Sequence, residues 1–138
     1  MKQSTRLLEI RTRGQGLYEC TSDIDDWVRQ QQMQTGLLTV FCRHTSASLL
    51  IQENADPTIR SDLQAFFHHI APESGPYKHN SEGRDDMPAH LKTALTQVQL
   101  SVPLMNSKLV LGTWQGIYLF EHRIRPHHRE VVLHLIGE

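Results

Sequence analysis

The sequence predicts an α+β fold: a single domain over residues 1–138 in which three helices pack against a mostly antiparallel β-sheet or sandwich. Two observations lead to this prediction. Apolar side chains recur at strand spacing near the start of the chain and through its last third, whereas helical spacing is confined to three segments between them. A chain of 138 residues also has an ordinary length for one domain with a sizeable core.

The first third is predicted to hold two strands and one helix. Residues 4–13 alternate loosely and end at a glycine-rich turn, which indicates a strand. Thr21 or Ser22 can cap a helix whose first turn is acidic, and Gly36 provides a stop. Residues 37–42 are apolar at nearly every position, so we expect this strand to be covered on both faces.

A polar interruption over residues 44–48 precedes a second apolar run, residues 49–51. The two runs form either a hairpin or one bent strand. Asp56 followed by Pro57 then marks the start of the clearest amphipathic helix in the chain. Its apolar residues are expected to lie in the core: Ile59, Leu63, Phe66, Phe67 and Ile70.

The remainder alternates between loop, helix and strands. Prolines and glycines in residues 71–84 indicate a long loop, and long loops in compact domains are often functional. Asp85 or Asp86 begins a short helix with Pro88 in its first turn. We expect its inward face to comprise Leu91, Ala94 and Leu95. The last third is predicted to be β-structure, with strands at residues 98–104, 109–111, 117–122 and 130–136.

Composition argues against several classes of partner. The net charge is −1, so no general nucleic-acid or anionic-membrane surface is expected. No apolar run approaches the roughly 18 residues of a membrane span. Cys20 and Cys42 form no CxxC pattern, which favours reduced thiols and a cytoplasmic location.

Histidine is the one unusual feature of the composition, with nine residues. His44 follows a predicted buried strand, His79 lies in the long loop, and His90 lies in the first turn of the short helix. Three imidazoles from three elements can bind a divalent metal ion and leave one position open. Asp86 precedes His90 by four residues and is placed to orient its ring. Surface or capping histidines are the alternative.

Two carboxylates and one turn complete the set of candidate functional residues. Glu53 has no evident structural role and can be a ligand or a general base, whereas Asp56 is better explained as a cap. Glu121 ends a strongly apolar strand, where it is either catalytic or paired with Arg123 or Arg129. Trp114 lies between two glycines and belongs either to the core or to a stacking surface.

Other catalytic patterns are missing from the sequence, which has no GxSxG elbow, no phosphate-binding P-loop and no GxGxxG turn. Ser46 or Ser48 beside His44 is a poor nucleophile candidate, because residues two or four apart on a strand need not touch. The candidates for binding a small substrate offer hydroxyl, amide or guanidinium groups: Thr45, Ser46, Gln115 and Arg129. The guanidinium of Arg129 can bind phosphate.

Several motifs together resemble one known family. They are His44-Thr45-Ser46-Ala47-Ser48-Leu49, Glu53-Asn54-Ala55-Asp56-Pro57, Tyr77-Lys78-His79, Asp85-Asp86-Met87-Pro88-Ala89-His90 and Leu111-Gly112-Thr113-Trp114-Gln115-Gly116-Ile117. In this order they resemble the YjbQ-like family, whose members are identified as secondary thiamine-phosphate synthases. The resemblance covers nearly the whole chain. Residues 123–128 depart from the family's common form.

The resemblance implies an α+β homotrimer with a metal ion, zinc or magnesium, in a cleft formed by His44, His79 and His90. The implied reaction joins an aminopyrimidine methyl diphosphate to a thiazole phosphate and releases pyrophosphate, as either the main activity or a side activity. Under this hypothesis the catalytic candidates are Glu53, Asp86, Trp114 and Glu121, and Trp114 faces the cationic ring. The alternative is a trimeric metal- or small-ligand-binding protein without catalysis.

Overall fold

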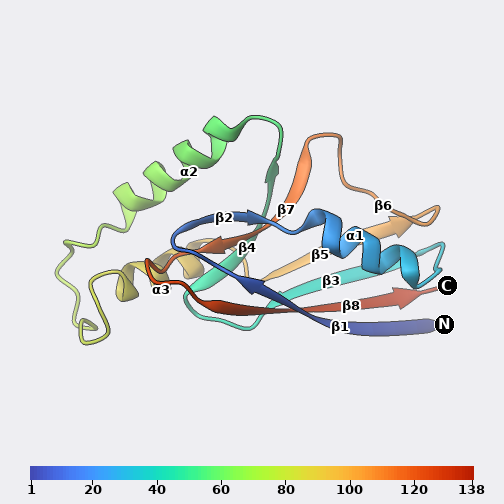
Figure 1. Cartoon of the computed structure of the whole chain (residues 1–138), viewed down its shortest axis with the longest axis horizontal. Coiled ribbons are helices and arrows are strands. Elements are labelled where there is room, and N and C mark those ends of the chain that lie inside the picture. The colour runs from blue at the N-terminus through green and yellow to red at the C-terminus, as the bar shows by residue number, and fades with distance from the viewer.

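Two antiparallel β-sheets share one apolar core in the computed structural model, which describes all 138 residues (Figure 1). The larger sheet has five strands, in the order β1 (Lys2–Arg11), β8 (His128–Gly137), β3 (Gly36–Cys42), β5 (Gln99–Met105) and β6 (Lys108–Leu109). The smaller sheet has three, in the order β2 (Gly16–Glu19), β7 (Gln115–Glu121) and β4 (Ala47–Glu53). Every neighbouring pair is antiparallel, and the predicted α+β class is confirmed.

The polar interruption between β3 and β4 is a passage from one sheet to the other. β3 pairs with β5 and β8, whereas β4 pairs with β7, so the hairpin alternative is wrong. The prediction that β3 is covered on both faces is also wrong. Leu37 is 42% exposed and Phe41 44% exposed, because alternate side chains of this antiparallel sheet point away from the core.

Helix α1 (Thr21–Gln30) closes the core between the sheets and buries Ile24, Trp27 and Val28. The predicted cap is wrong, since Cys20 occupies the position before the helix and makes no capping bond with its side chain. Thr21 is instead the first helical residue, and its hydroxyl accepts a hydrogen bond from the Ile117 amide at 2.8 Å. This contact ties the start of α1 to β7.

Helix α2 (Pro57–Ile70) begins as predicted, with the Asp56 carboxylate accepting a hydrogen bond from the Thr58 amide at 2.9 Å. Its predicted place in the core is wrong, because none of its residues is buried. Phe67 packs edge-on against Phe120, but Phe66 is 56% exposed. The apolar stripe of α2 is therefore only partly covered within one chain.

Helix α3 (Asp86–Leu95) has an inner face that differs from the prediction. The buried residues are Asp86, Pro88, Ala89 and Lys92, whereas Ala94 and Leu95 are exposed and Leu91 is half-buried. The inner face carries polar groups because it contributes to a cluster of ionic contacts at this end of the fold. No helix of the structure combines the length and the apolar character that crossing a membrane requires.

Two glycines lie opposite each other where β3 and β8 approach closely. Gly36 pairs with Gly137, and an added methyl group at either position would collide with backbone, the Thr35 carbonyl oxygen in the case of Gly137. The close approach explains both glycines without any special backbone angle.

We therefore expect Gly137→Ala to lower the free energy of unfolding by about 1–3 kcal/mol, as for other overpacking substitutions. Urea unfolding monitored by circular dichroism measures this. Gly112→Ala is the matched control, because the nearest atom to its added methyl is the side-chain oxygen of Gln115 at 3.4 Å. Equal stability of the two variants would contradict the proposed collision.

Candidate functional site

Three ligand-type side chains converge where α3 meets the long loop. His79 Nε2 lies 2.5 Å from Asp86 Oδ2, and His90 Nε2 lies 3.4 Å from the same oxygen. The three side chains can present one ligand atom each within 4.8 Å of one another. Ligands around a tetrahedral zinc ion at about 2.0–2.1 Å are separated by roughly 3.3 Å. His90 Nε2 and Asp86 Oδ2 already lie near this separation, whereas the His79–Asp86 contact would have to open to accept such an ion.

The protonation of His90 follows from its partners. Its Nδ1 lies 2.9 Å from the Thr45 carbonyl oxygen, which can only accept, so Nδ1 carries the proton. In the neutral ring Nε2 then presents a lone pair toward Asp86. A cation between these two atoms would be attracted by both of them. This arrangement fits a metal-binding histidine whose second nitrogen is fixed by a backbone carbonyl.

Asp86 is held as a carboxylate by its neighbours. Burial alone would raise its pKa, but the hydrogen bond from His79 and the positive charge of Arg123 outweigh burial and hold the pKa below the ordinary value. Arg123 Nη1 donates to Asp86 Oδ1 at 2.6 Å, and Arg123 Nε donates to Asp85 Oδ2 at 2.9 Å. Asp86 was expected to orient His90, whereas the structure places its other oxygen among the potential ligand atoms.

His44 lies outside this group. Its Nε2 accepts a hydrogen bond from the Glu130 amide at 2.8 Å, which places the proton of the neutral ring on Nδ1 and leaves neither nitrogen free for a metal ion. Burial lowers the pKa of His44, and the charge of Arg129 lowers it further, which favours the neutral ring. The structure thus brings together two of the three predicted histidines and adds Asp86 to them.

Glu121 and Arg129 form a buried ion pair. Arg129 Nε donates to Glu121 Oε1 at 2.8 Å and Nη2 donates to Oε2 at 2.5 Å. Thr12 also donates to Glu121, and Arg129 donates to the carbonyl and hydroxyl of Ser46. Burial alone would raise the pKa of Glu121, but the bonds from Arg129 and Thr12 hold it below the ordinary value. The ion-pair alternative for Glu121 is confirmed, with Arg129 rather than Arg123 as the partner.

The Trp114 turn and Glu53 lie at the other end of the smaller sheet. Glu53 pairs with Gln115 at the start of β7, whereas Ala47 pairs with Glu121 at its end. Six residues of strand separate the two ends, a distance of about 20 Å. Gln115 accepts a hydrogen bond from the Gly112 amide and so closes the turn, and Trp114 is 60% exposed. In Figure 1 the start of β7, next to this turn, lies far from α3, which carries His90.

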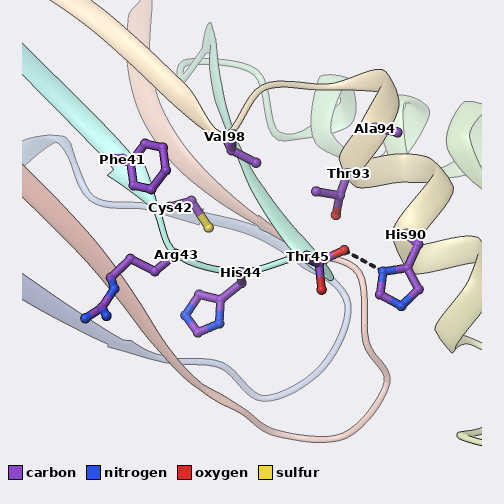
Figure 2. Close-up of a pocket in the computed structure, with 9 residues that line it drawn as sticks. All are labelled: Phe41, Cys42, Arg43, His44, Thr45, His90, Thr93, Ala94 and Val98. Carbon is purple, nitrogen blue, oxygen red and sulfur yellow. Dashed lines mark hydrogen bonds between the residues drawn. The ribbon is translucent and has the colours of Figure 1, made fainter.

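A cavity of about 620 Å³ adjoins the cluster on the far side of the His90 ring. One wall comes from the end of β3 and the segment after it, and the other comes from α3 (Figure 2). Its lining residues are Phe41, Cys42, Arg43, His44, Thr45, His90, Thr93, Ala94 and Val98. Ligand sites in proteins commonly enclose 300–1,000 Å³, so this cavity has the size for a small organic molecule.

Comparison with known proteins shows which family the chain belongs to. A sequence model described as "UPF0047 protein YjbQ-like" matches residues 6–138. The chain belongs to the YjbQ family. A UPF0047 protein of Synechocystis is 51% identical over 99% of this chain and 94% of the relative, and YjbQ of Salmonella typhimurium is 40% identical over 96% and 97%.

Solved YjbQ-family structures have the same fold. A YjbQ/UPF0047 protein from Clostridium acetobutylicum superposes with a TM-score of 0.88 at 33% identity, covering 95% of this chain and 99% of that one. A conserved hypothetical protein from Thermus thermophilus gives 0.84 at 34% identity, with the same coverage. The antiparallel sheets and three helices are thus features of YjbQ-family proteins.

Two side chains that shape the site of this YjbQ-family protein, those of Arg123 and His122, were not among the candidates predicted from the sequence. Arg123 was considered only as a partner for Glu121, yet its side chain bridges Asp85 and Asp86. His122 is buried beneath Phe120, and its Nε2 lies 2.9 Å from the Ser48 hydroxyl. A histidine that directly follows an apolar strand was a usable signal for His122, whereas the Arg123 contacts span 37 and 38 residues and leave no local pattern.

His122 should make the stability of the YjbQ-family fold depend on pH. Burial and the nearby charge of Lys92 lower its pKa to about 3 from an ordinary value of 6.5. Between pH 3 and pH 6.5 the unfolded chain therefore has this histidine protonated, whereas the folded chain keeps it neutral. The free energy of unfolding consequently falls as pH falls from 6.5 toward 3.

We expect His122→Asn to reduce the loss of stability between pH 7 and pH 5 by about 2 kcal/mol, the linkage contribution of one such histidine. Urea unfolding at the two pH values measures it. His69→Asn, at an exposed position of α2, should leave the wild-type pH dependence intact. An unchanged difference in His122→Asn would show that His122 is protonated normally in the fold.

Proposed function

We propose that this YjbQ-family chain is a cytosolic, divalent-metal-dependent enzyme that joins an aminopyrimidine methyl diphosphate to a thiazole phosphate. The family resemblance supplies the reaction. The observation that supports a metal-dependent enzyme is the cluster of His79, Asp86 and His90, with the lone pair of His90 Nε2 turned toward the carboxylate. Two imidazoles and one carboxylate with an open fourth position form a donor set typical of catalytic zinc sites. Imidazole donors also favour zinc over magnesium.

The reaction needs one bond broken and one formed. The bond between the pyrimidine methylene carbon and the diphosphate oxygen breaks, and its electron pair leaves with pyrophosphate. The thiazole nitrogen supplies the electron pair for the new carbon–nitrogen bond. An ion held by His79, Asp86 and His90 would neutralise the leaving diphosphate. The Thr45 carbonyl keeps the proton on His90 Nδ1, and Arg123 fixes the orientation of Asp86.

A second candidate is a non-catalytic metal- or small-ligand-binding protein. The observation in its favour is the distance between the predicted catalytic residues. Glu53 and Trp114 lie about 20 Å along β7 from the end that carries the histidines. The carboxylate of Glu121 is buried and fully engaged with Arg129 and Thr12. Only Asp86 of the four catalytic candidates lies in the cluster.

We also propose that the protein assembles as a homotrimer, as the resemblance implies. Apolar side chains that one chain leaves uncovered support assembly, since exposed apolar surface on one face commonly marks an interface. Phe66 and Ile70, four residues apart on α2, are such side chains. Light scattering coupled to size-exclusion chromatography distinguishes a trimer from a monomer.

Metal content tests the cluster directly. Purified wild-type protein should contain close to one divalent ion per chain by elemental analysis, and His79→Ala/His90→Ala should lose it, because two of three ligands are removed. His44→Ala should retain metal, since its Nε2 is bonded to the Glu130 amide. His69→Ala is the control for histidine loss at the surface. Equal metal content in the wild type and the double variant would exclude this centre.

Genetic rescue tests the reaction. Wild-type protein should restore growth of a thiamine auxotroph that lacks its main thiamine-phosphate synthase, whereas His79→Ala/His90→Ala should not. Loss of at least a hundredfold in turnover is expected of the purified double variant, because second-sphere changes alone cost 10–100-fold at metal sites. Rescue by the double variant would rule out the metal centre as the site of synthesis. Absence of rescue by the wild type, with metal bound, would favour the non-catalytic candidate.

A further inference from the structure

The cavity beside His90 has the chemistry of a site for a ring that carries an anionic group. We propose that Phe41 and Arg43 form the acceptor subsite of the chain, in which Phe41 packs against a small heteroaromatic ring and Arg43 binds its phosphate. The choice of a thiazole phosphate as occupant rests on the proposed function. The subsite itself is argued from the side chains that line the cavity.

Phe41 and Arg43 point to the same side of the chain. The Arg43 amide donates to the Glu130 carbonyl at 3.3 Å, so the pairing of β3 with β8 extends one residue beyond Cys42. Residues two apart on an extended strand share a face. Figure 2 shows both residues on the β3 side of the cavity, across from His90, with the long Arg43 side chain extended away from the Phe41 ring. Rotation of this side chain would bring its guanidinium to a ligand beside Phe41. Phe41 is 44% exposed, which leaves much of its ring surface free for a ligand.

Arg43 is the cation that can bind a ligand at this end of the fold. Its Nη1 lies 3.5 Å from the nearest Glu130 carboxylate oxygen, and about half of its side chain is exposed. A guanidinium has five N–H donors, and a single long contact leaves most of them for a phosphate. Arg129, by contrast, is 4% exposed and donates to both Glu121 and Ser46. Arg43 therefore takes the phosphate-binding role that was expected of Arg129.

The other side chains that line the cavity are suited to a ligand with a flat ring and a negatively charged group. No aspartate or glutamate lines the cavity, so apart from the Cys42 thiol its ionisable groups are Arg43 and two histidines. Val98, Ala94 and Phe41 supply apolar surface for a flat ring. The Thr93 hydroxyl is buried at this wall and has no partner within the protein. A neutral or negative ligand is thus favoured over a cation.

The position of the cavity makes it an acceptor site. His90 belongs both to the cavity wall and to the metal-type cluster, with Nδ1 bonded to Thr45 on one side and Nε2 near Asp86 on the other. A ring in the cavity lies beside any diphosphate held at the cluster. Trp114, which was expected to face the reacting ring, lies at the opposite end of β7. Phe41 is therefore the aromatic residue of this chain that is placed for that contact.

The test measures binding and does not depend on turnover. Calorimetry with 4-methyl-5-hydroxyethylthiazole phosphate, and separately with the unphosphorylated alcohol, is done on full-length protein with chelator present. We expect the wild type to prefer the phosphate by about tenfold in Kd. Arg43→Gln should abolish that preference while leaving the alcohol within twofold, and Arg43→Lys should restore part of it. Phe41→Ala should weaken both ligands about tenfold.

Leu37→Ala is the matched control, because Leu37 lies four residues earlier on the same face of β3, is 42% exposed and lies outside the cavity. It should bind as the wild type does. No binding of the thiazole phosphate by the wild type, a retained phosphate preference in Arg43→Gln, or unchanged binding by Phe41→Ala would each overturn the subsite. Failure of the proposed function would instead show as absent rescue or absent metal, with these binding constants unaffected.

Discussion

The buried ion pair between Glu121 and Arg129 is the contact on which the arrangement of the site depends. The chain crosses between the two sheets three times at this end, from β1 to β2, from β3 to β4 and from β7 to β8. Thr12 and Ser46 lie in the first two crossings, and Glu121 and Arg129 flank the third. Thr12 donates to Glu121, Arg129 donates to Ser46, and the ion pair joins the two contacts. Removing one partner of a buried pair commonly costs about 3–5 kcal/mol, because the other charge is left uncompensated. Here the same loss would also release the crossings from one another.

The candidate site is built on two of these crossings. Thr45, in the crossing from β3 to β4, fixes the ring of His90 through its carbonyl oxygen. Arg123, in the crossing from β7 to β8, fixes Asp86. Glu121, Arg129 and Ser46 thus hold the crossings together in the interior. The residues of the candidate site are attached to the solvent side of these crossings. Positioning by packed, fully bonded groups is what a binding site with defined geometry requires.

Local chemistry explains which predictions hold. Pro57 and Asp56 specify the start of α2 through contacts within two residues, and the alternation in β5 places its apolar side chains in the core. The predictions for the inner faces of α2 and α3 fail for a different reason. An apolar stripe shows that a helix has one face to bury, but the partner that buries it lies elsewhere in the chain. Phe66 and Leu95 consequently stay exposed, while Lys92 is buried beside His68.

Residue type and short-range spacing are enough to predict the α+β class, most strands, the start of α2 and the candidates His79, Asp86 and His90. The grouping of these candidates depends on contacts between distant parts of the chain. The tertiary structure bonds His44 to the Glu130 backbone, pairs Arg129 with Glu121, separates Trp114 from the histidines by the length of β7, and opens a cavity between β3 and α3. These contacts join residues up to 86 positions apart, and such pairings arise from the packing of two sheets rather than from any local pattern.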